Sequence, residues 1–162
     1  MVKVVIFDFD LTIFDSSLVK SFMDKRLWSL VYKNLHNCTF YPDVLNSINQ
    51  LKNNNIKIAI VSNAPATYIK KVLTFYSINI DFIVCYHDVY KHKPSAEGIN
   101  KVLNHFSIKN HEAIYIGDND IDYLTAKNAN IDFLGVSWGM FSQKINTIDY
   151  CNFINTINSK KK

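Results

Sequence analysis

The chain has 162 residues, which suits one compact domain, and its 48% apolar and 20% charged residues are the balance of a globular protein. No stretch approaches the roughly 20 apolar residues of a membrane span. The N-terminus has no basic region followed by a long apolar run, so we expect no signal peptide. The formal net charge is +4, but Arg26 is the only arginine, which argues against specific nucleic-acid binding.

Five short apolar runs, rich in β-branched residues, predict the strands of a sheet. They span residues 2–7, 56–62, 82–85, 113–116 and 133–137. Several are apolar almost throughout, which is typical of strands covered on both faces. Segments with helical spacing lie between them, and this alternation predicts an α/β fold with a mostly parallel, five-stranded sheet.

Residues 14–41 interrupt the alternation. The segment leaves directly after the first strand and returns before the next helix, so we interpret it as one long helix or a short helical hairpin over the end of that strand. An ordinary crossover helix is the alternative. We expect residues 1–162 to form a single domain with this segment as a short insertion. Its apolar residues at roughly helical spacing are Leu18, Phe22, Leu27, Val31 and Leu35.

The cysteines and the C-terminal lysines bear on location and partners. Cys38, Cys85 and Cys151 stand far apart without a CxxC pair, so they form no recognisable zinc or disulfide framework. A reducing, cytoplasmic location fits this pattern. We expect the lysine run 160–162 to be a solvated tail.

Two carboxylates, Asp8 and Asp10, come directly after the first predicted strand and can share one face. Like charges so close repel each other, and without a partner one of them would tend to stay protonated. Mg²⁺ relieves this conflict because it prefers carboxylate and water oxygens. Taken alone, the pair is explained slightly better by a turn or a helix cap than by a metal site.

Polar clusters also fall where other predicted strands end. A hydroxyl and an ammonium group suit phosphoryl oxygens, and acids from two strands suit a metal ion. Because the carboxyl ends of parallel strands meet at one edge of a sheet, we expect these groups to lie close together. Each has a plainer interpretation as a turn, a surface lysine or a helix cap, but their coincidence favours a phosphoryl-transfer site. The clusters contain Ser62 and Asn63, then Lys93 before Pro94, then Asp118 and Asp122 in the sequence GDNDID.

Together these motifs resemble those of the haloacid dehalogenase-like hydrolases, in particular the phosphoglycolate-phosphatase-like branch. DFDLT is similar to the first motif of that family, Ser62 and Lys93 to the second and third, and GDNDID to the fourth. The resemblance spans nearly the whole chain and implies a Rossmann-like three-layer sandwich with a minimal helical cap. The chain departs from the family at Leu11, where glycine is common, and in the cap, for which only residues 14–41 are available.

The resemblance also implies an activity, that of a phosphatase hydrolysing a phosphate monoester through an aspartyl-phosphate intermediate. Asp8 would be the nucleophile, and Asp10 would protonate the leaving oxygen and then activate water. Ser62, Asn63 and Lys93 would bind the phosphoryl group.

A magnesium ion is the cofactor that the resemblance implies. Asp8, the backbone carbonyl of Asp10 and Asp118 would hold it. Thr12 would order the loop after Asp10, and Asp122 would orient Lys93 or a metal-bound water from behind.

Other functions of the same fold remain open from the sequence. A dehalogenase has no use for an acid at position 10, which argues against that activity. A phosphomutase or other phosphotransferase, or a non-catalytic protein that binds a phosphorylated ligand, are the alternatives to a phosphatase. The substrate is a phosphorylated small molecule or an exposed phosphate on a macromolecule, and the oligomeric state is open. Candidate substrate contacts are Ser16, Ser17, Lys20, Arg26 and Trp28.

Overall fold

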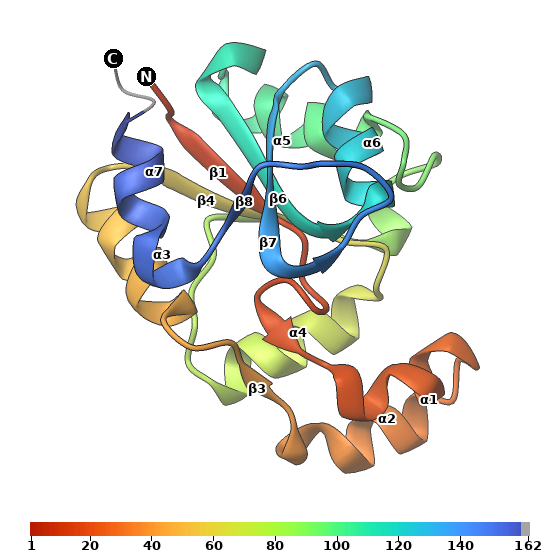
Figure 1. The fold of residues 1–162 in the computed structure, drawn as a ribbon. Helices are drawn as coiled ribbons and strands as arrows, with labels where there is room; N and C mark the ends of the chain where they lie inside the picture. The colour runs from red at the N-terminus through yellow and green to blue at the C-terminus, as the bar shows by residue number, and fades with distance from the viewer. Residues whose placement is uncertain (160–162) are drawn as a thin grey trace.

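The computed structural model describes residues 1–159, and its centre is a six-stranded sheet in which every neighbouring pair of strands is parallel (Figure 1). The order across the sheet is β5-β4-β1-β6-β7-β8. The strands are β1 (Val4–Phe7), β4 (Lys57–Val61), β5 (Phe82–Val84), β6 (Ala113–Asn119), β7 (Asp132–Met140) and β8 (Thr147–Ile148).

The predicted α/β class and parallel sheet are confirmed, but the predicted number of five strands is wrong by one. The missed strand, β8, has only two residues and pairs with Gly135 and Val136 at the edge of the sheet. So short a strand carries no apolar run that a sequence pattern could detect.

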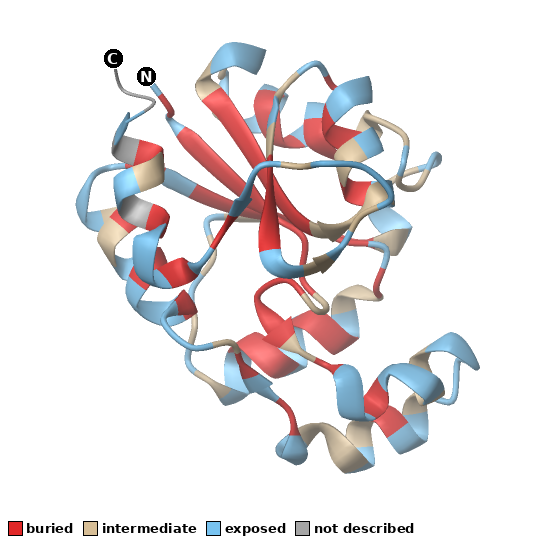
Figure 2. Ribbon diagram, in the orientation of Figure 1, coloured by how far each residue is buried: buried red, intermediate tan, exposed pale blue. Residues whose placement is uncertain are grey.

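The central strand β1 explains why the sheet has helices on both sides. All four of its residues are buried, and successive side chains point to opposite faces. Val5 and Phe7 belong to one apolar cluster, whereas Val4 and Ile6 belong to a second. Figure 2 shows this buried layer running through the middle of the molecule.

Two groups of helices cover these clusters. On the side of Phe7 lie α3 (Val44–Asn53), α4 (Ala66–Phe75) and α7 (Phe153–Ser159). On the other side lie α5 (Glu97–Phe106) and α6 (Asp120–Asn128). Single 3₁₀ turns connect several elements, at Ser17–Val19, Leu35–Asn37, Tyr86–Asp88, Asn110–Glu112 and Tyr150–Asn152.

The segment that interrupts the alternation folds as a hairpin of two short helices, α1 (Lys20–Asp24) and α2 (Trp28–Asn34). A small antiparallel pair, β2 (Phe14–Asp15) and β3 (Thr39–Phe40), closes its base. We call residues 17–37 the helical hairpin. It projects from one end of the molecule beside α4 (Figure 1).

Aromatic contacts dock the helical hairpin on α4. The ring centroids of Trp28 and Tyr68 lie 5.9 Å apart, and the Tyr32 hydroxyl lies 3.2 Å from the Thr67 hydroxyl. The turn between α1 and α2 places Arg26 in the left-handed region, with φ of 55°.

The remaining expectations concern membranes, cysteines and the C-terminus. Within residues 1–159, none of the helices has both the length and the apolar character needed to cross a membrane. Cys38 and Cys85 are buried, Cys151 is exposed, and all three are free thiols. The lysine run 160–162 lies outside the described residues.

Candidate active site

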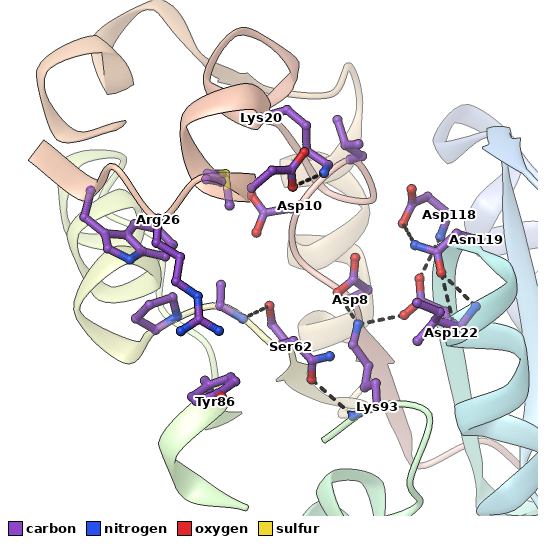
Figure 3. Close-up of a pocket in the computed structure, with 18 of the residues that line it drawn as sticks. Asp8, Asp10, Lys20, Arg26, Ser62, Tyr86, Lys93, Asp118, Asn119 and Asp122 are labelled. Carbon is purple, nitrogen blue, oxygen red and sulfur yellow. Dashed lines mark hydrogen bonds and ion pairs between the residues drawn. The ribbon is translucent and has the colours of Figure 1, made fainter. Parts of the chain in front are cut away.

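The polar side chains predicted at the strand ends line one pocket of about 460 Å³ at the carboxyl edge of the sheet (Figure 3). The loops after β1 and β4, the junction of β6 with α6 and the loop before α5 contribute to it, as expected for parallel strands. Thr12 lies behind the pocket and is fully buried. The predicted site residues that line the pocket are Asp8, Asp10, Ser62, Asn63, Lys93, Asp118 and Asp122.

Lys93 is the centre of the hydrogen-bond network. Its Nζ donates to Asp8 Oδ1 at 2.6 Å and to Asp122 Oδ1 at 2.7 Å, and the three side chains are at most 8% exposed. Burial alone would lower the pKa of Lys93, but Asp122 and Asp8 together raise it well above its usual value. Lys93 therefore keeps its positive charge inside the pocket.

Tyr115 supports this ion-pair network from the sheet. Its hydroxyl accepts a hydrogen bond from Lys93 Nζ at 3.1 Å and lies 3.1 Å from both Val61 O and Asp122 Oδ1. Burial raises the pKa of Tyr115 well above its usual value, with Asp122 adding to the effect. The phenol stays neutral and fixes the direction from which Lys93 enters the pocket.

Three carboxylates crowd beside Lys93, and one oxygen from each of Asp8, Asp118 and Asp122 lies within 4.8 Å of the others. Burial and the charge of Asp122 raise the pKa of Asp8 to about 8, against the opposing effect of Lys93. Burial and Asp122 likewise raise the pKa of Asp118 to about 6. The Thr12 hydroxyl lies 3.1 Å from Asp8 Oδ2 and 3.3 Å from Asp118 Oδ1, tying the two acids together.

This donor set fits a hard divalent cation. Its ligand atoms are carboxylate oxygens, and their mutual repulsion in a buried pocket is the conflict that such a cation relieves. The side chain of Asp10 is not part of this cluster, and the ligand that the family resemblance implies for this residue is its backbone carbonyl.

Asp10 is held by a different part of the molecule. Its Oδ1 accepts a hydrogen bond of 2.6 Å from the hydroxyl of Tyr68 on α4. Burial raises the pKa of Asp10, whereas Tyr68 lowers it. Burial and Asp10 hold the pKa of Tyr68 far above its usual value, so its phenol remains a donor. Ser16 Oγ is buried beside these two side chains, and its hydroxyl lowers the pKa of both.

The loop after β4 carries Ser62 and Asn63. Ser62 Oγ accepts a hydrogen bond from the Ala64 N–H at 3.1 Å, which leaves its hydroxyl proton free to donate into the pocket. Asn63 Oδ1 accepts from the Lys93 N–H at 3.1 Å. Asn63 thus connects this loop to the loop that carries Lys93.

The sequence GDND forms the tight junction between β6 and α6. A Cβ on Gly117 would lie 2.3 Å from the Asp122 Cβ, so only glycine allows this approach. Asn119 Oδ1 accepts from the N–H groups of Ile121 and Asp122 and caps α6, while its Nδ2 donates to Asp118 Oδ1 at 3.0 Å.

The helical hairpin forms one rim of the pocket. Of the candidate substrate contacts, Lys20, Arg26 and Trp28 line the pocket. Lys20 is paired with Asp24, whereas the Arg26 guanidinium has no hydrogen bond or ion pair within the part of the chain that the structure describes. Ser16 is buried behind Asp10, and Ser17 lies on the exposed surface outside the pocket.

Sequence reasoning missed three residues that hold the site together, Tyr68, Tyr115 and Asn119. Tyr68 lies inside a predicted helix and Tyr115 inside a predicted strand, away from the strand ends at which site residues were expected. Tyr115 did carry a signal, because its phenol stands out within the buried run AIYI and needs a partner. Tyr68 carried none, since its partner Asp10 is 58 positions away.

A family model for haloacid dehalogenase-like hydrolases matches residues 17–136, and the chain belongs to this family. Asp8 and Asp10 precede the matched segment, while Ser62, Lys93 and Asp118 lie inside it. The resemblance drawn from the motifs is thus confirmed at the level of the family.

Solved structures share the fold at low sequence identity. A HAD-superfamily hydrolase of subfamily IA from Geobacter sulfurreducens superposes with a TM-score of 0.78 at 18% identity, covering 96% of this chain and 100% of that chain. A HAD-superfamily hydrolase from Ehrlichia chaffeensis gives a TM-score of 0.74 at 22% identity, with 100% of both chains covered. These likenesses bear on the fold alone.

Curated relatives in this family are phosphatases. A phosphoglycolate phosphatase of Psychrobacter arcticus is 30% identical over 109 residues, which cover 61% of this chain and 44% of that protein. A pyrophosphatase PpaX of Bacillus cereus is 30% identical over 100 residues, which cover 60% and 46%. The chain thus spans less than half the length of these relatives.

Proposed function

We propose that the protein is a Mg²⁺-dependent phosphatase that hydrolyses a phosphate monoester through a phosphorylated Asp8. The observation that carries the proposal is the buried contact of Lys93 Nζ with Asp8 and Asp122 inside the pocket of a haloacid dehalogenase-like hydrolase. The names of the curated relatives support phosphate hydrolysis as the reaction type.

Asp8 begins the reaction. A carboxylate oxygen of Asp8 attacks phosphorus and forms an aspartyl-phosphate, and the bond from phosphorus to the ester oxygen breaks. Asp10 gives its proton to the departing oxygen and is left as a carboxylate. In the second half, Asp10 takes a proton from water as the water oxygen attacks phosphorus. Inorganic phosphate leaves, and Asp8 is regenerated.

The phosphoryl group would be bound by the loops after β4 and before α5. The Ser62 hydroxyl donates to one phosphoryl oxygen, and Lys93 neutralises the charge on the equatorial oxygens. Asn63 accepts a hydrogen bond from the Lys93 backbone N–H and thereby fixes the position of Lys93 relative to Ser62. Since Lys93 is already paired with Asp8, it also keeps the nucleophile oriented before substrate arrives.

Asp8, the backbone carbonyl of Asp10 and Asp118 would hold Mg²⁺. When bound, the ion neutralises the repulsion between the Asp8 carboxylate and the phosphate anion. Thr12 orients Asp8 and Asp118 from behind, and Asp122 fixes Lys93.

The helical hairpin would act as a short cap that contacts the substrate. Its unpaired Arg26 guanidinium at the pocket rim is the group available to a second anionic group on the substrate. Arg26 could contact such a group on a small phosphorylated metabolite or on a macromolecule with an exposed phosphate. The substrate panel below separates these two kinds of substrate.

The test is phosphate release from a panel of substrates with Mg²⁺ present. The panel contains an aryl phosphate, sugar phosphates, nucleotides, phosphoglycolate, pyrophosphate, a phosphopeptide and a 3′-phosphorylated oligonucleotide. We expect turnover by the wild-type protein and none by Asp8→Asn. Asp120→Asn is the matched control, because it makes the same substitution in the GDND motif next to the site, and Asp120 lies outside the pocket, where it accepts from the Ser142 N–H. Release from no substrate, or a wild-type rate in Asp8→Asn, would contradict the proposal.

A further inference from the structure

Tyr68 donates a short hydrogen bond to the Asp10 side chain. The phenol oxygen lies 2.6 Å from Asp10 Oδ1, and the Tyr68 side chain is fully buried. Tyr68 does not line the pocket, whereas Asp10 does. Tyr68 therefore meets the acid from behind and cannot touch a substrate.

Packing fixes the position of the Tyr68 hydroxyl. Its ring meets Phe9 edge-on at 5.9 Å between centroids, and Trp28 of the helical hairpin lies against it, also at 5.9 Å. The residue sits in the first turn of α4, directly after the loop that carries Ser62 and Asn63. A buried tyrosine with contacts on two sides has little rotamer freedom, so the hydroxyl is a fixed donor.

We propose that Tyr68 is a positioning residue for Asp10, which it holds with Oδ1 engaged and Oδ2 left for the reacting oxygens. The assignment rests on the proposed function, in which Asp10 gives a proton to the leaving oxygen. Because the phenol engages Oδ1, Oδ2 is the oxygen left to exchange a proton with the reacting oxygens. Without the phenol, the carboxyl group can rotate and present either oxygen, so fewer molecules are poised for transfer.

The experiment compares Tyr68→Phe with wild type on two substrates that differ in their need for a proton. An alkyl phosphate requires protonation of its leaving oxygen, whereas 4-nitrophenyl phosphate has a good leaving group and requires little. The value of kcat/KM covers the first chemical step, so it isolates this proton transfer from the later attack of water. General acid catalysis contributes about 10²–10⁴-fold, which sets the upper limit of the effect.

We expect Tyr68→Phe to lose about tenfold or more in kcat/KM on the alkyl phosphate and about threefold or less on 4-nitrophenyl phosphate. A merely structural role for the hydroxyl would lower both by the same factor. In an Asp10→Asn background, Tyr68→Phe should have no further effect on the alkyl phosphate, because the group that it orients is absent.

Tyr76→Phe is the matched control. Tyr76 caps the same helix, and its hydroxyl also makes a 2.6 Å hydrogen bond, but to the backbone oxygen of Cys38. This variant loses an equivalent hydrogen bond that does not involve Asp10, so the ratio of the two kcat/KM values should stay at the wild-type value.

Several outcomes would overturn the assignment. Equal losses on both substrates, or no loss on either, would each show that the hydroxyl does not position Asp10. In those cases wild-type turnover leaves the proposed function standing. A wild-type protein that hydrolyses neither ester would instead overturn the proposed function, and this assignment with it.

Discussion

The edge of the sheet and the helical hairpin contribute to the same pocket in opposite ways. At the edge, Lys93, Asp8 and Asp122 are buried and hydrogen-bonded to one another. In the hairpin, Val19 and Val31 alone among its residues are fully buried, and the Arg26 guanidinium stands unpaired. Groups at the edge can therefore be held in fixed positions for chemistry, whereas groups on the hairpin are free to meet different substrates.

Removing the Lys93 ammonium group should have the largest effect on activity and stability at the buried edge of the sheet. Lys93→Met leaves Asp8 and Asp122 as buried acids without a cationic partner, so we expect loss of turnover and a destabilisation of about 3 kcal/mol. Chemical denaturation and phosphate release measure the two effects. Lys91→Met is the control, because Lys91 is exposed in the same loop and should change stability by less than about 0.5 kcal/mol.

Filling the space at Gly117 tests how tightly the edge is packed. Gly117→Ala would place a methyl group 2.3 Å from Asp122, and we expect about 1–3 kcal/mol of destabilisation together with a large fall in kcat. Gly98→Ala provides the comparison, since its methyl group would meet the Val61 side chain at 2.8 Å in the apolar cluster between α5 and the sheet. That variant should lose stability while its folded fraction keeps the wild-type kcat.

The crowded acids predict a pH dependence of stability in EDTA. The pKa of Asp8 is raised to about 8, so its contribution to stability is complete below its ordinary pKa of 3.8 and is lost as pH rises toward 8. Over this range Tm should fall more for wild type than for Asp8→Asn, and Mg²⁺ should restore the wild-type Tm at the alkaline end. Parallel curves for the two proteins, with no response to Mg²⁺, would contradict this expectation.

Changes on the hairpin should alter recognition and leave stability intact. Arg26→Glu should raise KM about tenfold for a substrate with a second anionic group, with little change in kcat or Tm. The wild-type KM should also rise with ionic strength. Lys33→Glu makes the same charge reversal on α2 outside the pocket and should leave KM unchanged.

The smallest effect is expected at Leu11, where the family often has glycine. The residue has φ of 59°, a left-handed conformation that costs a leucine about 1 kcal/mol, while its carbonyl accepts from Trp138 Nε1. Leu11→Gly should relieve this strain but increase the conformational entropy of the unfolded chain. Because these two effects oppose each other, the Tm of the variant should stay close to the wild-type value. A large loss of activity would mean that the leucine side chain itself contributes to the site.

The same contrast explains what the sequence could predict. Strand β1 and the acids after it are local patterns, and the rule that parallel strands end at one edge is enough to bring Asp8, Lys93 and Asp118 together. The edge strand β8 and the Tyr68–Asp10 contact depend on tertiary packing between distant segments. The apolar periodicity of residues 14–41 did not distinguish a helical hairpin from one long helix, because two short helices and one long helix share the same apolar spacing.

The central claim is that Asp8 carries the phosphoryl group, and trapping that intermediate tests it most directly. Asp10→Asn should still let Asp8 attack an aryl phosphate but should slow the attack of water on the intermediate. We therefore predict that acid-quenched Asp10→Asn, incubated with Mg²⁺ and 4-nitrophenyl phosphate, carries one phosphoryl group on the peptide containing Asp8, detected by mass spectrometry. The double variant with Asp8→Asn serves as the blank. Steady turnover by wild type with no phosphorylated peptide in Asp10→Asn, or with the phosphoryl group on another residue, would contradict the account.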